Sequence, residues 1–289
     1  EKRAYIVINE VSASLKPLYT AYENNPDYPE RLFLNSAEAL ELADESSMVV
    51  VVDTNRPGMT ECEELLHVAK TIVVLDHHRQ SSDNIDNALL SYIEPYASSA
   101  CEMVSEVLQY IVDDIKIPNL EASSLYAGIM IDTNNFMNKT GVRTFEAAAF
   151  LRRSGADITL VRKMFRDDME SYRAKAQIIS SAKVYHNKYA IARGENLTIE
   201  SPTIIGAQAA NELLDINEVK ASFVLTTYNG RIYVSARSID EVNVQLVMEK
   251  LGGGGHMSIA GAQLTDCTID QAVNKIKLTL DNMIKDGEI

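Results

Sequence analysis

The first half of the chain alternates short apolar runs with segments of helical composition, and this alternation restricts the fold more than any other feature. The apolar runs, rich in β-branched residues, are Ala4–Ile8, Met48–Val52 and Thr71–Leu75. Such runs are typical of strands buried on both faces, as in a parallel sheet covered by helices. Ser36–Leu42 and Glu61–Ala69, which lie between them, have helical composition. We therefore predict an α/β fold with a parallel sheet in the first half.

Three helices are expected after these strands. The first follows Ser99–Glu102, which has the spacing of a capping box, and carries an apolar stripe of helical period from Val104 to Ile115. The second should run from about Leu120 to Ile131. The third starts after Thr144 and stops near Gly155, a residue type favoured just past helix ends.

The second half has a different character. Ile158 to about Val184 is a long helical pattern with few breakers, which predicts one connecting helix. Farther on, two alternating, β-rich segments flank Asn229-Gly230, a strong hairpin signal. The remaining expected elements are a helix near Val242–Leu251, a glycine run, a short strand and a helix over Ile269–Lys285.

The length of the chain predicts two domains. At 289 residues it exceeds the size at which one hydrophobic core usually stops growing. We expect a parallel-sheet domain over residues 1–157, a connecting long helix over 158–185 and a smaller α/β domain over 186–289. The chain begins without Met and almost directly inside a strand pattern, so we expect it to be part of a longer protein.

The chain is acidic, with 27 Lys and Arg against 41 Asp and Glu and a formal net charge of −14. This balance argues against a long nucleic acid or an anionic membrane as partner, because neither gains by releasing counterions to an acidic protein. It allows one small anionic substrate, provided that metal ions supply the local positive charge. With no run of 18 apolar residues, we expect no transmembrane helix and no membrane contact by this segment.

The three cysteines indicate a reducing compartment. Cys62, Cys101 and Cys267 are odd in number, far apart and without metal-site spacing. We interpret them as reduced thiols of a cytoplasmic protein.

Asp and His side chains follow apolar runs, and the carboxyl ends of parallel strands are where open α/β sheets place their sites. Asp53 ends one run and Asp76-His77-His78 the next, while Asp132 follows Ala127–Ile131. An Asp in this position is often only a turn residue, so each alone has a structural reading as well. Adjacent imidazoles, however, add little to a turn and supply neutral nitrogen ligands. Asp and His without thiolates suit Mn²⁺ or Mg²⁺, and paired divalent ions are the usual device of phosphoester hydrolysis.

A run of glycines in the second half is a candidate ligand loop. Gly252, Gly253, Gly254 and Gly255 precede His256. Contiguous glycines expose backbone N–H groups and let a phosphate or a base edge approach closely. The alternative is a flexible linker, but this run is short and lies inside predicted structure.

These motifs, in this order, resemble the DHH phosphoesterase superfamily with its C-terminal glycine-loop domain. The resemblance covers essentially the whole chain. Segments 52–57, 94–99 and 242–256 are similar to the GdpP-type cyclic di-AMP phosphodiesterases rather than to the RecJ exonucleases or the short-oligonucleotide ribonucleases. The resemblance implies a parallel-sheet DHH catalytic domain, a smaller α/β substrate-binding domain and two Mn²⁺, or Mg²⁺ or another divalent ion in their place.

The resemblance also implies roles for the candidate residues. Asp53 would bridge both metals, and His77 and Asp132 would complete one of the two ligand shells. Asp76 would orient that site, and His78 would face the scissile phosphate. The substrate would be held by the glycine loop and by His256. Weaker substrate-binding candidates are Ser235, Arg237 and Ser238, and Arg143 would contribute positive charge near the substrate.

The implied reaction is hydrolysis of one 3′–5′ phosphodiester of cyclic di-AMP, a bacterial second messenger, to linear pApA. Two alternatives stay open, namely an oligoribonuclease or pAp phosphatase of the same superfamily and a non-catalytic module that binds a cyclic dinucleotide. The family's opening His…Asp-x-Asp motif has no match here, so we expect little hydrolase activity from these 289 residues alone. GdpP-type proteins usually carry upstream membrane helices, which would anchor this part at the cytoplasmic face, and a homodimer is a further expected assembly.

Overall fold

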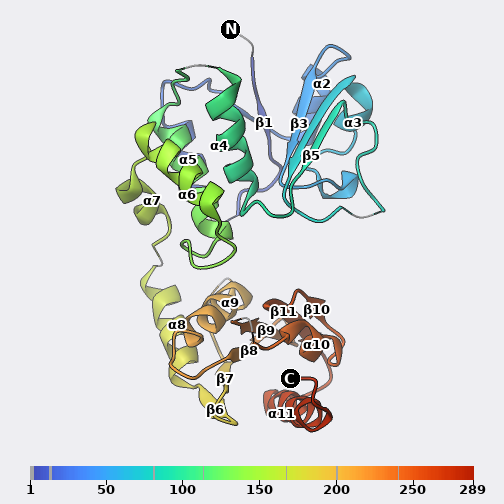
Figure 1. Cartoon of the computed structure of the whole chain (residues 1–289), viewed down its shortest axis with the longest axis vertical. Coiled ribbons are helices and arrows are strands. Elements are labelled where there is room, and N and C mark those ends of the chain that lie inside the picture. Colours follow the sequence, from blue (N-terminus) through green and yellow to red (C-terminus); the bar gives the residue numbers. More distant parts are fainter. Residues whose placement is uncertain are drawn as a thin grey trace. The chain divides into compact units, whose positions relative to one another are not determined.

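The computed structural model describes residues 3–12, 15–80, 82–112, 114–166, 168–199, 201–239 and 241–289. They form two compact units that divide after Arg166, and each unit is described by itself (Figure 1). No helix among the described residues is both long and apolar enough to cross a membrane.

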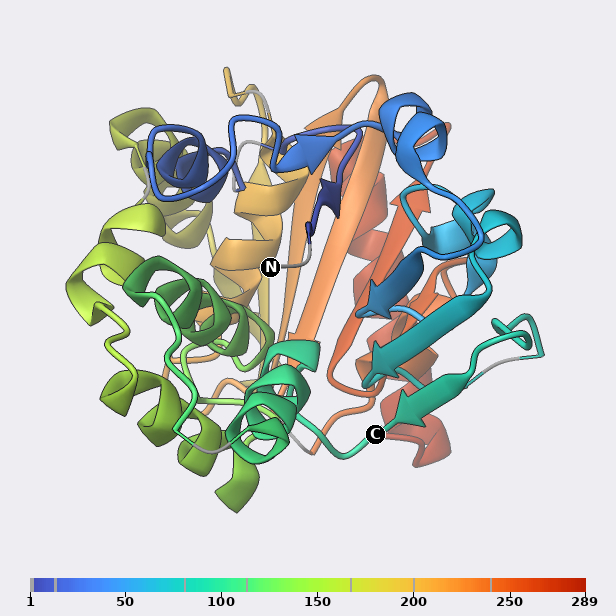
Figure 2. The same ribbon diagram turned by 90° about the horizontal axis from the view of Figure 1, so that it is seen from above.

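The first unit contains the predicted parallel sheet. Its strand order is β3-β4-β5, with β3 at Met48–Val52, β4 at Thr71–Asp76 and β5 at Leu90–Ile93. The three strands run side by side in one direction, as the blue-to-teal arrows of Figure 2 show, so their carboxyl ends share one edge. The expected first strand is shorter than predicted, since β1 spans Ile6–Val7 and pairs only with β2 (Phe33–Leu34).

Burial of both faces is confirmed for β4 and wrong for β3. Val74 of β4 is fully buried, whereas Met48, Val50 and Val52 of β3 are 60%, 48% and 50% exposed. The reason is that β3 is an edge strand of this sheet and its side chains alternate between faces. Val51 points to the covered face and joins a buried cluster, while no described residue buries the opposite face of β3.

Three helices pack side by side in the first unit, as Figure 1 shows. They are α4 (Ala100–Ile111), α5 (Asn119–Asp132) and α6 (Val142–Arg153), close to the predicted ranges. Ile129 and Leu151 are buried among them, because their apolar faces meet in one cluster. The shorter helices of this unit are α1 (Lys16–Glu23), α2 (Ser36–Leu42), η1 (Pro57–Met59), α3 (Leu65–Val68) and α7 (Ile158–Met164).

Half of the predicted capping box at the start of α4 forms. The Ser99 hydroxyl accepts a hydrogen bond from the backbone N–H of Glu102 at 3.0 Å. The Glu102 carboxylate, 1% exposed, accepts instead from the Ser98 hydroxyl at 2.5 Å. The start of α4 is therefore fixed by a buried polar pair that also holds the loop before it.

The single connecting helix predicted over 158–185 is wrong. The segment contains α7, then α8 (Met169–Ser180) and strand β6 (Lys183–Tyr185). Asp157 caps α7 and Asp168 caps α8, each by accepting hydrogen bonds from backbone N–H groups two and three residues later. Such a cap begins a new helix, although the apolar periodicity continues across the break. Ile178 of α8 is buried in the core of the second unit.

The second unit is a six-stranded, mixed sheet in the order β10-β11-β9-β8-β7-β6. Alternate strand residues face opposite helix layers, since Val224 packs with α8 and α9 while Phe223 packs with α10 and α11. The predicted hairpin is confirmed, with Asn229 and Gly230 at φ of 49° and 73° between β8 and β9. The remaining elements are β7 (Tyr189–Gly194), α9 (Pro202–Leu213), β8 (Ala221–Tyr228), β9 (Arg231–Ser238), α10 (Val244–Glu249), β10 (Gly254–Gly255), β11 (Ile259–Leu264) and α11 (Ile269–Asp286).

Candidate metal centre

The structure brings Asp53, His77 and Asp132 together. The Nε2 atom of His77 lies 3.3 Å from Asp53 Oδ1 and 4.0 Å from Asp132 Oδ2. Asp53 follows β3, His77 follows β4, and Asp132 is the last residue of α5. The sheet edge thus supplies two members of the group, and a packed helix supplies the third.

Asp53 adopts a strained backbone conformation at this edge. Its φ of 66° lies in the left-handed region, which costs a non-glycine residue about 1 kcal/mol. Its N–H still donates to the carbonyl of Leu75 at 3.0 Å, so the chain turns sharply only after the last ladder hydrogen bond. This turn places the carboxylate beside His77.

Both histidines are anchored through Nδ1. His77 Nδ1 lies 3.3 Å from the carbonyl oxygen of Ala97, and His78 Nδ1 lies 2.8 Å from Asp76 Oδ1. Because both oxygens only accept, each Nδ1 carries the proton and donates it. In the neutral ring this leaves the Nε2 lone pair free, which for His77 faces the two carboxylates.

His78 is held in place by a buried polar pair, Asp76 and Asn55. Asp76 is fully buried, and its Oδ1 also accepts from the backbone N–H of His78 at 3.1 Å. Its Oδ2 accepts from Asn55 Nδ2 at 2.5 Å, and Asn55 is 3% exposed. Sequence reasoning missed Asn55 because an Asn shortly after a strand is typical of a turn. The only available signal was its place in the segment 52–57 on which the resemblance partly rests.

The charges of the cluster favour a bound cation. The hydrogen bond with Asp53 raises the pKa of His77, although burial acts in the opposite direction. Burial and the nearby charge of Asp53 raise the pKa of Asp132. Asp53, His77 and His78 each offer a ligand atom, all within 4.8 Å of one another, so His78 extends the predicted ligand group. Carboxylate oxygens and imidazole nitrogens fit a divalent cation such as Mn²⁺ or Mg²⁺.

Cys101 lies behind the cluster without joining it. Burial, together with the nearby charges of Asp132 and Asp53, raises the pKa of its thiol to about 12. The three cysteines are free thiols, as predicted. At neutral pH the Cys101 sulfur is protonated, so it is no thiolate ligand.

Arg143 was predicted to contribute positive charge, but acidic neighbours balance its charge. Its guanidinium donates to both carboxylate oxygens of Glu106, at 2.7 and 2.6 Å, and lies 3.5 Å from Glu94. The Glu106 hydrogen bonds raise the pKa of Arg143 above its usual value. In this arrangement Arg143 connects α6 to α4 and to the segment after β5.

The glycine run in the second unit is mostly used for internal packing. The N–H of Gly253 donates to Met248 at 2.8 Å, and a Cβ there would lie 2.1 Å from the Gly261 carbonyl oxygen. Gly252 and Gly255 have φ of 79° and 144°, which side chains rarely adopt. Gly254 differs, because a Cβ there would meet nothing within 4 Å. The N–H of Gly252 likewise donates to Glu249, at 3.0 Å, so the prediction of freely exposed N–H groups is wrong for Gly252 and Gly253. Within the run, only Gly254 offers open space without backbone strain.

The other predicted substrate residues of the second unit lie on β9 and directly after β10. Arg237 is partly buried, and it donates to Asn211 at 3.0 Å and to the Ala236 carbonyl at 2.9 Å. Burial lowers its pKa. Ser235 pairs in register with Gly261 of β11, and Ser238 is buried with its hydroxyl 3.4 Å from the Met257 carbonyl. His256 follows β10 and is exposed.

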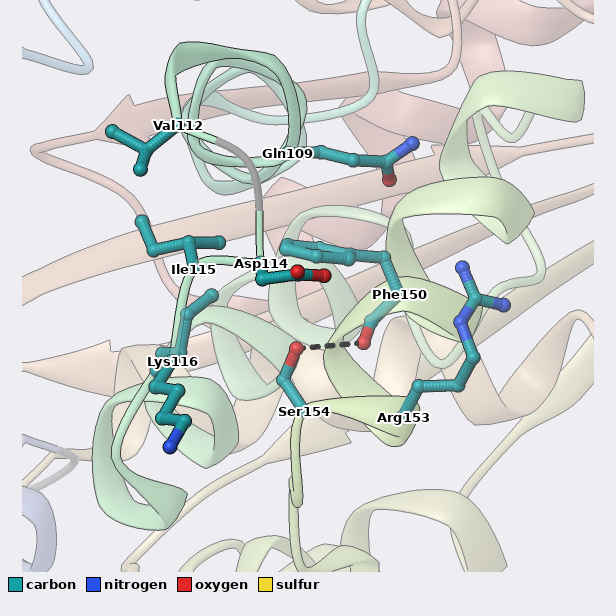
Figure 3. A pocket seen from close by; sticks show the side chains of 9 residues that line it. Gln109, Val112, Asp114, Ile115, Lys116, Phe150, Arg153 and Ser154 are labelled. Carbon is teal, nitrogen blue, oxygen red and sulfur yellow. Dashed lines mark hydrogen bonds between the residues drawn. The ribbon is translucent and has the colours of Figure 1, made fainter.

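A pocket of about 470 Å³ lies elsewhere in the first unit (Figure 3). None of the sequence-predicted site residues lines it. It therefore adds no group to the metal cluster. Its lining comes from the ends of α4 and α6 and the segment between α4 and α5, namely Gln109, Val112, Asp114, Ile115, Lys116, Ile117, Phe150, Arg153 and Ser154.

Two family models match the chain. The model described as the DHH family, N-terminal domain, matches residues 4–129, and the DHHA1 domain model matches residues 196–286. The first range covers the strands that carry Asp53 and His77, and the second covers the glycine run.

Two curated relatives match nearly the whole chain. The chain is 40% identical over 284 residues to the cyclic-di-AMP phosphodiesterase PdeA of Listeria monocytogenes, covering 97% of this chain and 43% of that protein. It is 39% identical over 291 residues to the cyclic-di-AMP phosphodiesterase GdpP of Geobacillus thermodenitrificans, covering 100% of this chain and 44% of that protein. The chain thus spans less than half the length of these relatives.

A solved structure shares the fold. The crystal structure of an exopolyphosphatase-related protein from Bacteroides fragilis superposes with a TM-score of 0.73 at 20% identity. The superposition covers 93% of this chain and 87% of that chain, so the likeness includes both units.

Proposed function

Because the chain belongs to the DHH family, we propose that it hydrolyses cyclic di-AMP to linear pApA as a metal-dependent phosphodiesterase. The observation that supports the proposal most strongly is the placement of the Asp53 and Asp132 carboxylates beside His77 Nε2, at 3.3 and 4.0 Å. The names of the similar curated proteins support the choice of substrate.

The residues of the cluster divide into holding and positioning roles. Asp53, His77 and Asp132 would hold divalent metal, two Mn²⁺ in the full site, with Asp53 shared between them. Such ions, when bound, activate water and offset charge on the phosphate oxygens. Asp76 orients His78 through Nδ1, which leaves His78 Nε2 to face the scissile phosphate, or to add to the ligand group.

The second unit would hold the rest of the substrate. Gly254 supports this role. Its backbone is unstrained and an added Cβ would meet nothing within 4 Å, so packing does not require a glycine at this position, whereas close approach of a ligand does. His256, Arg237, Ser235 and Ser238 complete the proposed substrate-binding group. Among these, exposed His256 is the side chain most open to a ligand.

The test is product analysis with an Asp132→Ala variant. Two proteins are tested, namely the 289 residues and a longer natural chain that contains them. Each is incubated with cyclic di-AMP and Mn²⁺, and the products pApA and AMP are separated by chromatography. Loss of a metal ligand should reduce turnover by at least about 100-fold, while Asp286→Ala, an exposed carboxylate at the end of α11, should keep it.

Three outcomes would contradict the proposal. Full turnover by Asp132→Ala would refute the metal assignment. Rapid AMP formation from pApA or short RNA, with cyclic di-AMP untouched, would favour the oligoribonuclease or pAp phosphatase alternative. Tight binding of cyclic di-AMP with no product under any metal, in the longer natural chain as well, would favour a binding module.

A further inference from the structure

A half-exposed aromatic ring stands on the segment that follows Asp132. Phe145, near the start of α6, is 55% exposed. Its ring stacks on that of Phe136, with centroids 5.8 Å apart and planes inclined by 24°. Phe136 in turn contacts the ring of Tyr126 in α5 at 5.6 Å. One side of Phe145 is therefore supported by rings that join the helix core, while the rest is open to solvent.

The chain adopts an unfavourable backbone to place Phe136 there. Asn134, Asn135 and Phe136 have consecutive φ values of 47°, 58° and 64°. The left-handed region suits Asn but is a genuine outlier for a bulky aromatic residue. It persists because Thr133, fully buried, accepts the Phe136 N–H at 3.0 Å and donates to the Ile129 carbonyl at 2.6 Å. The turn begins directly after Asp132, so the two rings are held at a fixed place relative to the metal cluster.

Other large apolar side chains on the same stretch of chain, residues 131–145, are exposed as well. Ile131, Met137 and Val142 are 63%, 66% and 75% exposed. Ile131 adjoins Asp132, the Met137 N–H donates to the Thr133 carbonyl, and Val142 lies three residues before Phe145 on α6. Several exposed apolar side chains on the stretch of chain that carries Asp132 favour a ligand with an apolar face, whereas single exposed ones need no explanation.

We propose that Phe145 stacks on a purine base of the substrate and so determines preference for base-bearing phosphodiesters. The proposal rests on the proposed function and deepens it. A purine is planar and uncharged, so it meets an aromatic face without repulsion from the acidic chain, while its phosphate belongs at Asp132 and the metal. Because Phe136 already fixes the ring, little side-chain entropy is lost on binding.

Kinetics of Phe145 variants test this role. Phe145→Leu should raise KM for cyclic di-AMP roughly 5- to 150-fold, the range expected for one base–aromatic stack, with kcat within about twofold. Phe145→Tyr keeps the aromatic ring, so its KM should equal that of the unaltered protein. Tyr110→Leu, at an 81% exposed aromatic position on α4, is the matched control and should change neither constant.

A fluorescence measurement tests the contact itself. The chain has no Trp, so Phe145→Trp introduces a single indole in place of the Phe145 ring. A phosphorothioate analogue of cyclic di-AMP, which resists hydrolysis, should quench that emission on binding. The emission of Tyr110→Trp should not change. The end of α4 nearest His77 is its start at Ala100, and Tyr110 lies ten residues, about 15 Å, farther along the helix.

The outcomes separate this inference from the proposed function. Calorimetric binding of the analogue without quenching at position 145, together with an unchanged KM in Phe145→Leu, would overturn the stacking role and leave the phosphodiesterase proposal standing. A Phe145→Leu variant that loses only self-association would also overturn it, since the face would then bind a second copy. Absence of both binding and turnover in a longer natural chain that contains these 289 residues would overturn both proposals. Circular dichroism confirms that each variant is folded.

Discussion

Gly128 in α5 offers the most direct test of the packing behind the metal centre. A glycine in a helix interior costs about 1 kcal/mol relative to Ala, so Gly128→Ala would stabilise a permissive site. Here the added Cβ would lie 2.3 Å from the Cys101 sulfur and 3.2 Å from the Cys101 Cβ. The substitution therefore forces the sulfur, and with it the α4–α5 contact, to move.

The expected free energies follow from these two opposing effects. Overpacking of a tight core contact costs about 1–3 kcal/mol, which the gain in helix propensity only partly offsets, so Gly128→Ala should lower the free energy of unfolding by about 0–2 kcal/mol. In a Cys101→Ala background the sulfur is gone and the same change should be neutral or stabilising by about 1 kcal/mol. The two substitutions should thus be coupled by up to about 3 kcal/mol.

Urea unfolding of the four proteins of this double-mutant cycle measures the coupling. Calorimetric titration with Mn²⁺ adds a second readout, because Asp132 lies one helical turn beyond Gly128 and moves with α5 relative to His77. Mn²⁺ affinity should fall in Gly128→Ala and recover in the double variant. If Gly128→Ala had the same effect in both backgrounds, the close contact between α4 and α5 would be refuted.

Two further predictions concern buried groups of the site. Asn55→Ala removes a donor from the buried Asp76 carboxylate and should lower the free energy of unfolding by about 1.5–3 kcal/mol; an unchanged value in urea would contradict the pairing. Cys101, with a thiol pKa of about 12, should have a thiolate fraction of only about 10⁻⁴ at pH 8 and gain reactivity as pH rises or the protein unfolds. Iodoacetamide labelling followed by mass spectrometry checks this, and rapid modification of folded protein at pH 8 would be the contrary result.

The elements that sequence predicts well are those whose signals are local. The apolar runs of β3 and β4 place Asp53 and His77 at one sheet edge because side chains at the ends of neighbouring parallel strands must be close. The hairpin at Asn229-Gly230 forms because both residues tolerate a positive φ.

What sequence does not predict depends on contacts between distant segments. From the sequence, Asn55 is typical of a turn; its positioning role depends on the hydrogen bond of its amide to Asp76, 21 residues away. The glycine run reads as a ligand loop, yet Gly253 is required by the Gly261 carbonyl of β11. The break before α8 is hidden because apolar periodicity continues past the Asp168 cap.

The three residues of the metal cluster are positioned partly by local contacts and partly by contacts between distant segments. Asp53 and His77 are fixed by adjacent strands and by local hydrogen bonds to Leu75 and Ala97. Asp132, by contrast, is placed near His77 by the packing of α5 against its neighbouring helices, which includes the close contact of Gly128 with the Cys101 thiol of α4. A core substitution between these helices therefore acts on one ligand and leaves the other two in place. Metal affinity should respond to the packing of α4 against α5 more than to changes at the exposed face of β3, since that face orders none of the three ligands.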